Sequence, residues 1–199
     1  TPSTDYFPVS AELPLSDSHG RVMRDLRVSI TDRCNFRCLY CLPETEEAAS
    51  FYRGKFDALK NPQPTFTPIV REWKPKSSLL SYEEIERVVR VAVGLGIEKV
   101  RLTGGEPLLH REIDQIVQGA IARKKFVIVC TNALLLEKKM NLFKPSKWFS
   151  WSVHLDGGRE EHDASVCQTG VYDRAVAAIA ESKRRGFRTI INATLFNNA

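Results

Sequence analysis

The sequence of 199 residues has no long hydrophobic run. No stretch approaches the roughly 18 apolar residues that predict a membrane-spanning helix. The first 25 residues also lack the basic and apolar regions of a signal peptide. These absences predict a protein without a membrane span, located in the cytoplasm.

The sequence also lacks a strong excess of one charge. Its 29 basic and 24 acidic residues give a net charge of +5, and the two signs are mixed along most of the chain. A nucleic-acid-binding surface usually needs a concentrated basic patch. We therefore expect no nucleic-acid partner, whereas a small phosphorylated substrate is compatible with this charge.

Cysteine is scarce, with five residues in all, but three of them lie within one segment of eight residues. Cys34, Cys38 and Cys41 are too close together for mutual disulfides, so their spacing favours a metal site in a reducing compartment. Zinc usually takes paired cysteine or histidine ligands, and no second pair follows. Thiolates suit a 4Fe-4S cluster, which normally takes four of them, so three leave one iron open. Zinc or three unrelated thiols are the alternatives.

A regular alternation of strands and helices follows the cysteine segment. Residues 1–25 lack clear periodicity and predict an extended lead-in, and residues 44–78 hold four prolines, which predict an irregular insertion. Ser81 and Glu84 form a capping box that starts a helix, and Gly94 lies at its end. The expected strands are 27–30, 99–103, 126–130, 149–155 and 187–195, and the expected later helices are 113–122, 133–140 and 172–185.

This order of elements predicts an α/β fold with parallel strands, either a barrel or a doubly wound sheet. A hydrophobic content of 43% can bury such a core. A complete (β/α) barrel takes about 250 residues, and the pattern stops near Asn197. We therefore expect one core domain over residues 26–199, a partial (β/α) barrel truncated at its C-terminus.

A second motif, Gly104-Gly105-Glu106, comes directly after the expected strand 99–103. Glycines there let the backbone approach a ligand closely, and a glutamate can accept hydrogen bonds from an ammonium group. The alternative is an ordinary turn. The carboxyl ends of barrel strands are also where catalytic sites are found.

Together, the Cys-x3-Cys-x2-Cys spacing, Tyr40 before the last cysteine and the Gly-Gly-Glu motif identify the chain as a member of the radical S-adenosylmethionine superfamily. The resemblance implies that Cys34, Cys38 and Cys41 bind a 4Fe-4S cluster, whose open iron chelates S-adenosylmethionine for reductive cleavage to a 5′-deoxyadenosyl radical. It also implies that Tyr40 lies by the adenine and that Gly104, Gly105 and Glu106 bind the methionyl amine. An external reductant such as flavodoxin or ferredoxin is then required.

Residues 13–112 resemble molybdenum cofactor biosynthesis protein A, the GTP 3′,8-cyclase family, in the phrases Leu26 to Cys38, Leu42-Pro43 and Val100 to Pro107. That resemblance implies that Arg27 and Arg101 contact GTP, and that Tyr40, Gly105 and Ser152 contact S-adenosylmethionine. Guanidinium groups suit phosphate because they bind it through two hydrogen bonds. Surface salt bridges are the alternative role for both arginines.

Residues 113–199 resemble the hopanoid-biosynthesis radical enzyme, adenosylhopane synthase, which adds the adenosyl radical to a lipid alkene. The similarity lies in phrases such as Cys130 to Leu136 and Ser152 to Gly157. Cys130 stands where the cyclases have a GTP-contacting threonine, and Ile190 where they have a substrate-binding lysine. The two resemblances meet near Glu112, which fits a divergent cyclase, a natural fusion or a chimera.

Several polar residues at the expected strand ends have alternative roles. Cys130 is either a small buried residue or a hydrogen-atom donor to a substrate radical. Thr131 and Asn132 contact cofactor or substrate, or form a turn. His154 and Asp156 alternate with Ser152 and share its face. His154 is then a core histidine or an iron ligand, Asp156 a ribose ligand or the cap of a turn, and Cys167 incidental.

Three functions follow from these observations. The first is GTP 3′,8-cyclase-like chemistry in molybdenum cofactor biosynthesis, and the second is addition of the adenosyl radical to a hopene. The third is a noncatalytic iron–sulfur module for electron transfer. The Gly104-Gly105-Glu106 motif argues against it, because electron transfer needs no amine-binding site. The cyclases bind a second cluster through C-terminal cysteines that this sequence does not contain.

Overall fold

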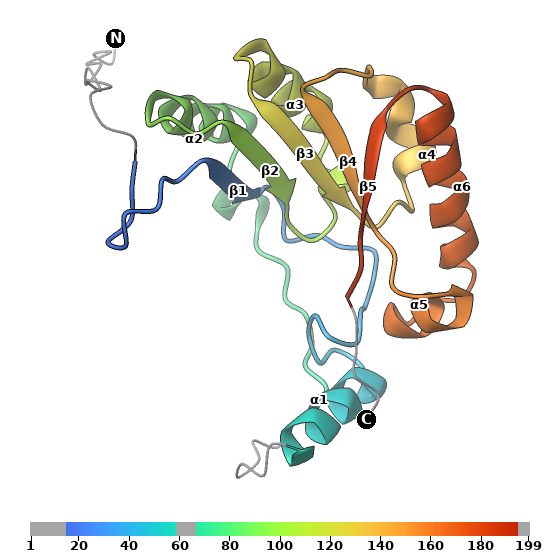
Figure 1. Ribbon diagram of the computed structural model, residues 1–199. Helices are drawn as coiled ribbons and strands as arrows, with labels where there is room; N and C mark the ends of the chain where they lie inside the picture. Colours follow the sequence, from blue (N-terminus) through green and yellow to red (C-terminus); the bar gives the residue numbers. More distant parts are fainter. Residues whose placement is uncertain (1–14, 59–66, 195–199) are drawn as a thin grey trace.

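A five-stranded parallel sheet forms the centre of the protein. The computed structural model describes residues 15–58 and 67–194. The strands lie side by side in sequence order, β1-β2-β3-β4-β5, and their carboxyl ends point toward the cysteine segment (Figure 1). The strands are β1 (Asp25–Ser29), β2 (Lys99–Thr103), β3 (Phe126–Thr131), β4 (Phe149–His154) and β5 (Arg188–Asn192). This arrangement confirms the predicted α/β class, as an open sheet of the (β/α) type.

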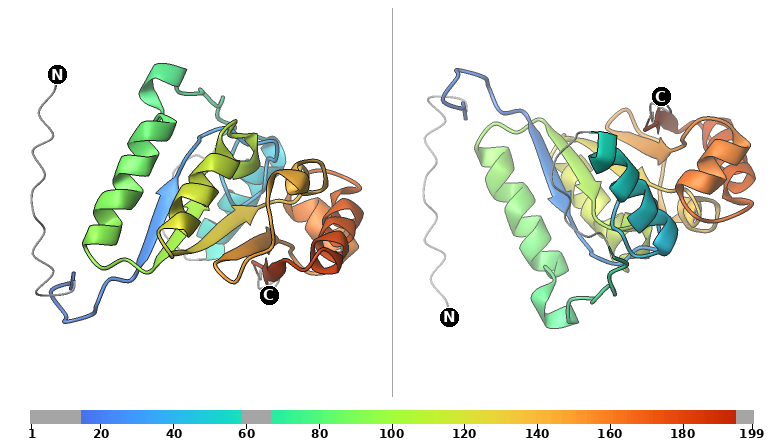
Figure 2. Two further views of the ribbon diagram at one scale, coloured as in Figure 1. Left: turned by 90° about the horizontal axis from the view of Figure 1, so that it is seen from above. Right: turned by 90° about the horizontal axis from the view of Figure 1, so that it is seen from below.

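Helices between the strands cover one face of the sheet (Figure 2). The larger ones are α2 (Tyr82–Gly94), α3 (Ile113–Ala122) and α6 (Val171–Arg184), with the shorter α4 (Leu136–Lys139) and α5 (Arg159–Ser165). Single 3₁₀ turns lie at η1 (Lys76–Ser78), η2 (Pro107–Leu109) and η3 (Met140–Leu142). No helix in the described part of the chain is long and apolar enough to cross a membrane.

The alternation of side chains along each strand gives the sheet two different faces. The residues that point to the helices are apolar and buried, including Val100, Val129 and Trp151. Trp151 packs edge-on against Phe149 with ring centroids 4.7 Å apart. The alternate positions on the other face are more polar. One row in register there consists of Arg27, Arg101, Ile128, Ser150 and Arg188.

The segment 44–78 is not irregular throughout, which corrects the expectation from its prolines. Helix α1 spans Glu46–Ala58 and lies beyond the carboxyl ends of the strands (Figure 1). The four prolines all follow residue 58, so none interrupts the helix. Glu46 and Glu47 lie in its first turn, where negative charge interacts favourably with the helix dipole and stabilises the helix. The prolines of this segment therefore do not prevent the helix.

The lead-in before β1 is not simply extended either. Within its described part, Ser16 and Val22 form an isolated antiparallel bridge. Asp17 closes the turn between them by accepting hydrogen bonds from the backbone N–H groups of His19 and Arg21. Residues 1–14 lie outside the described residues.

The capping box that the sequence predicts is present at the start of α2. The Ser81 side chain accepts from the Glu84 N–H at 3.2 Å, and the Glu84 carboxylate accepts from the Ser81 N–H at 2.8 Å. Ile85 and Val89 then bury one face of α2 against the sheet. The cap therefore fixes the first turn of a helix that covers β1 and β2.

We predict that Ser81→Ala lowers the free energy of unfolding by about 1 kcal/mol, because one cap bond is lost and the Glu84 N–H loses its partner. Urea unfolding followed by circular dichroism measures this change. Ser77→Ala is the control, since its hydroxyl makes no hydrogen bond within the described chain. An equal loss in both variants would show that the cap is not the cause.

Candidate functional site

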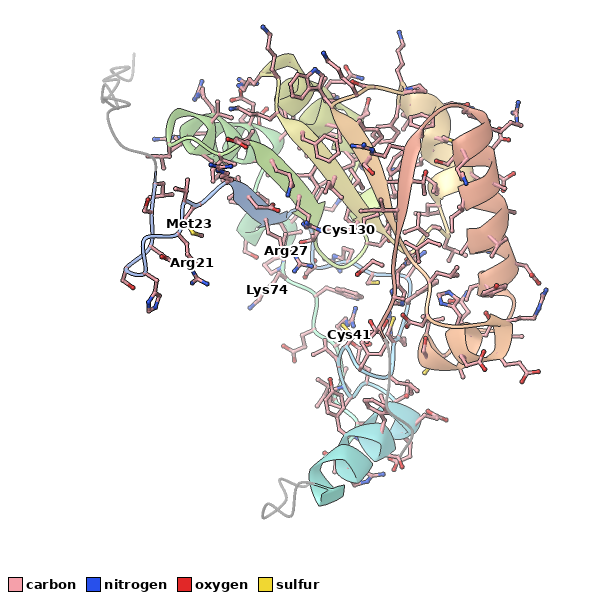
Figure 3. The ribbon with its side chains drawn as sticks, in the orientation of Figure 1. Arg21, Met23, Arg27, Cys41, Lys74 and Cys130 are labelled. Carbon is pink, nitrogen blue, oxygen red and sulfur yellow. The ribbon has the colours of Figure 1, made fainter. Side chains whose placement is uncertain are left out.

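A cavity of about 490 Å³ lies at the carboxyl ends of the strands. It is large enough for a small-molecule ligand, since such pockets usually measure about 300–1,000 Å³. Figure 3 shows Arg27 and Cys130 near the sheet, Lys74 below them and Cys41 on the loop between the sheet and α1. All four residues line this cavity.

The three cysteines of the predicted cluster site line the cavity together. Cys34 and Cys38 are half-buried, and Cys41 is exposed. The buried Phe36 ring forms a small hydrophobic cluster with Val166 and Val171, and Cys34 and Cys38 pack against this cluster. The Cys34 sulfur also accepts a hydrogen bond from the Phe36 N–H at 3.4 Å. The loop between the cysteines is therefore anchored by one aromatic side chain.

The thiol environment fits a group that brings positive charge. Burial, and then repulsion from the charges of Cys34 and Cys41, raises the pKa of the Cys38 thiol to about 12. Burial likewise raises the pKa of Cys34, and Cys41 adds to the effect. The three sulfurs line one cavity and disfavour each other's ionisation. Iron offsets this cost when it binds thiolates, so the three residues fit a 4Fe-4S cluster.

The backbone of Gly104 and Gly105 lies against the cysteine loop, the segment of residues 31–41. The sequence predicts that these glycines let the backbone approach a ligand, and in the structure they let it approach this loop. A Cβ on Gly105 would lie 2.1 Å from the Arg33 carbonyl oxygen, and one on Gly104 would lie 2.3 Å from that of Thr31. Gly104 also has a φ of +144°, which favours glycine. The Gly105 N–H donates to Thr31 O at 2.7 Å, and the Glu106 N–H donates to Arg33 O at 2.7 Å. Two missing side chains thus allow two backbone hydrogen bonds.

The Glu106 carboxylate is buried at 1% exposure and lines the cavity. Its Oε1 accepts from the Leu108 N–H at 3.0 Å and from the Thr131 hydroxyl at 2.7 Å, and its Oε2 accepts from the Asn132 N–H at 2.8 Å. Burial raises the pKa of Glu106, and these hydrogen bonds oppose that rise. A carboxylate offers about four acceptor sites, so one remains for a further donor.

Thr131 and Asn132, predicted as ligand contacts, join parts of the site to each other. Both line the cavity at the end of β3. Thr131 and the Asn132 N–H hold Glu106, while the Asn132 side chain donates to the Asn35 side chain at 2.8 Å. The end of β3 is therefore connected to both the Gly-Gly-Glu segment and the cysteine loop.

Tyr40 connects the cysteine loop to the end of β4. Its hydroxyl lies 2.6 Å from His154 Nε2 and 3.0 Å from Asp156 Oδ2, to which it donates. Helix α1 supports the same residue, because the Tyr52 hydroxyl donates to the Tyr40 carbonyl at 2.7 Å. Burial raises the pKa of Tyr40, and nearby Cys38 adds to the rise. The phenol therefore stays protonated and serves as a donor.

His154, Asp156 and His162 are close enough to suggest a metal site, since one ligand atom from each lies within 4.8 Å of the others. Their hydrogen bonds argue against that role. Asp156 Oδ2 accepts from Tyr40 and the Ser165 hydroxyl and faces His154 Nε2 at 3.0 Å. Its Oδ1 accepts from the Thr194 N–H, and His162 Nδ1 accepts from the Asp156 N–H. His154 and Asp156 thus form a hydrogen-bond network that holds Tyr40, which fits the alternative of a core histidine at position 154.

The predicted substrate contacts separate into two groups. Arg27 lines the cavity, whereas Arg101 lies outside the lining residues and pairs with Asp25 at 3.4 Å. Cys130 and Ser152 both line the cavity and are in register on β3 and β4. Ile190 is the register partner of Ser152 on β5 and is 42% exposed. Cys130 therefore faces the cavity and is only half-buried, as the hydrogen-donor hypothesis requires.

One part of the site was missed by sequence reasoning. Arg71, Glu72, Trp73 and Lys74 also line the cavity, although they belong to the insertion that was expected to be irregular. The available signal was an aromatic residue within a short run of charged residues. Such a run usually indicates a solvated surface, so the signal was weak.

The model of the radical SAM superfamily matches residues 28–198. The chain therefore belongs to this superfamily, whose cofactors are a 4Fe-4S cluster and S-adenosylmethionine. SuiB of Streptococcus suis, solved bound to S-adenosylmethionine, superposes with a TM-score of 0.62 at 19% identity over 88% of this chain and 35% of SuiB. That likeness shows the fold.

Relatives with higher sequence identity are GTP 3′,8-cyclases. The enzyme of Aliarcobacter butzleri (strain RM4018) is 32% identical over 89% of this chain and 48% of its own length. That of Mycolicibacterium smegmatis (strain ATCC 700084 / mc(2)155) is 34% identical over 94% of this chain and 46% of its own. The similarity thus continues beyond Glu112, and the chain spans about half the length of these relatives.

We predict that Gly105→Ala destabilises the protein by about 1–3 kcal/mol, the usual effect of overpacking, because the new methyl group collides with backbone that cannot swing away. It should also lower the iron bound per chain after anaerobic reconstitution, since the cysteine loop is displaced. Iron analysis and urea unfolding measure the two effects.

Gly94→Ala is the matched control, because nothing lies within 4 Å of the added Cβ. It should retain both iron content and stability. Full iron binding by Gly105→Ala would contradict the inference that these glycines serve to dock the cysteine loop.

Proposed function

We propose that Cys34, Cys38 and Cys41 of this chain hold a 4Fe-4S cluster and that the chain cleaves S-adenosylmethionine reductively. When bound, such a cluster supplies one electron to the sulfonium, which releases a 5′-deoxyadenosyl radical. The observation that carries the proposal is the convergence of three half-buried or exposed thiols and the buried Glu106 on one cavity. The protein then has to orient the cofactor and limit access of water.

In this proposal the residues around the cluster bind and orient S-adenosylmethionine. Glu106 accepts a hydrogen bond from the methionyl ammonium through its remaining acceptor site, and Gly104 and Gly105 line the cavity beside it. Tyr40 and Ser152 contact the adenosyl part. Thr131 and Asn132 act on the cofactor mainly through Glu106, whose carboxylate they hold in place.

GTP is the substrate we propose first, as in molybdenum cofactor biosynthesis. The similarity to GTP 3′,8-cyclases over about nine-tenths of the chain supports this choice. Arg27 and Lys74 line the cavity, and neither has a carboxylate partner within the described chain, so both are available for a phosphate. Arg101 would first have to leave Asp25.

A hopene is the second candidate, favoured by the face of β3, β4 and β5. Cys130 lines the cavity where it can donate a hydrogen atom, and the exposed Ile190 adds apolar surface to the same row. In that reaction the S–H bond breaks and a C–H bond forms on the substrate radical. The sulfur radical left behind then takes an electron from the external reductant and a proton from solvent, which restores the thiol.

The proposed chemistry needs a one-electron donor. We propose a small redox protein such as flavodoxin or ferredoxin as this partner. The described cysteines are all free thiols, which suits the reducing conditions of the cytoplasm.

We predict that the anaerobically reconstituted protein releases 5′-deoxyadenosine when S-adenosylmethionine and dithionite are added. Replacing Cys34, Cys38 or Cys41 by alanine should reduce iron content and abolish this product, because a cluster ligand is lost. Chromatography measures the nucleoside. Cys167→Ser is the control, since Cys167 does not line the cavity. A bound cluster without cleavage would instead support the noncatalytic electron-transfer module.

A second experiment separates the substrates. GTP and a hopene are offered in turn to the reconstituted protein, and the products are analysed by mass spectrometry. With the hopene in D₂O, we predict that the adduct gains one deuterium from the exchangeable Cys130 thiol. Cys130→Ala should then lose the adduct but retain 5′-deoxyadenosine formation. Unchanged adduct formation by this variant would exclude Cys130 as the donor.

A further inference from the structure

Residues 69–74, here called the strap, cross the cysteine loop. The Ile69 N–H donates to Pro43 O at 2.8 Å, and the Lys74 N–H donates to the Asp32 carboxylate at 2.7 Å. The Arg33 guanidinium donates to Lys74 O at 2.9 Å. Both ends of the strap are therefore fixed to residues that flank the cysteines.

The middle of the strap is held by a buried carboxylate. Glu44, three residues after Cys41, keeps only 6% of its side chain exposed and forms an ion pair with Arg71, itself 13% exposed. Its second oxygen lies 2.7 Å from Arg37 Nε, in an ion pair whose geometry falls short of a hydrogen bond. One carboxylate thus lies between two guanidinium groups.

Three arginine side chains lie over the Trp73 ring. The guanidinium carbons of Arg71, Arg33 and Arg37 lie 4.8, 5.0 and 5.8 Å from its centroid. Each distance is within the range of a cation–π contact. Arg71 therefore has two independent contacts that fix its charge in place, the Trp73 face and the Glu44 carboxylate.

The fixed charge and the cysteine sulfurs share one cavity. Arg71 lines the same cavity as Cys34, Cys38 and Cys41. In a half-buried site such a charge is screened less than on an open surface. Arg71 can therefore stabilise negative charge that is added to groups bound by these sulfurs.

We infer that Arg71 is a positioning and tuning residue for the cluster, held by Glu44 and Trp73 so that its charge favours the one-electron reduced state. This inference rests on the proposed function, because it requires that the cysteines bind the cluster. Reduction by dithionite adds one electron to the cluster, and the guanidinium nearby makes that electron easier to accept. Glu44 acts in the opposite sense and limits the effect.

The test measures the midpoint potential of the reconstituted cluster in the full chain, by electron paramagnetic resonance at a series of applied potentials. Arg71→Gln should lower the potential, so that the ratio of reduced to oxidised cluster falls by about tenfold at the wild-type midpoint, equivalent to about 59 mV for one electron. Arg71→Lys keeps the charge and should stay near the wild-type value. Arg90→Gln on α2 is the surface control.

Glu44→Gln provides the decisive comparison. It removes a negative charge and should raise the potential, whereas a strap that only holds the loop would shift the potential in one direction in both Glu44→Gln and Arg71→Gln. Shifts of the same sign, or a low potential in Arg71→Lys, would overturn the inference. A wild-type chain that binds no iron would overturn the proposed function instead, so the two failures are distinguishable.

Discussion

The close contact between two backbone segments is the constraint on which the rest of the site depends. The end of β2 lies so near the loop before Cys34 that neither Gly104 nor Gly105 has room for a Cβ. The hydrogen bonds from Gly105 and Glu106 to that loop then fix both segments at once. Because β2 is paired with β1 and β3, the cysteines take their place from the rigid part of the sheet.

Glu106 and Glu44 are both buried carboxylates near the cysteine loop, but different kinds of partner stabilise them, and this difference suits two roles. Glu106 is held by two backbone N–H groups and one hydroxyl, none of which carries a charge, so its negative charge is left to interact with a cationic ligand. Glu44 is held by two guanidinium groups, which already neutralise it. The first arrangement suits binding of an ammonium group, and the second suits attachment of one segment to another.

The parts of the fold and site that follow local rules could be predicted from the sequence. The Ser81 capping box, helix 113–122 and the cysteine spacing each depend on residues that are neighbours in the chain. The Tyr40 network could not be predicted, because its partners lie more than a hundred positions away and meet it only through the order of the strands. The strap was missed for the same reason. Trp73 makes cation–π contacts with Arg33 and Arg37, which are distant in sequence and which only the fold brings near it.

The row formed by Cys130, Ser152 and Ile190 shows why the cofactor is easier to assign than the substrate. Ser152 lies between the other two in register and lines the cavity, as Cys130 does. Cys130 and Ile190 offer neither charge nor a strong hydrogen bond, so they give a phosphate little to bind. An anionic substrate would have to take its contacts from Arg27 and Lys74, which line the same cavity. Substrate choice therefore depends on which of these lining residues the substrate contacts, whereas the proposed cofactor site does not change with that choice.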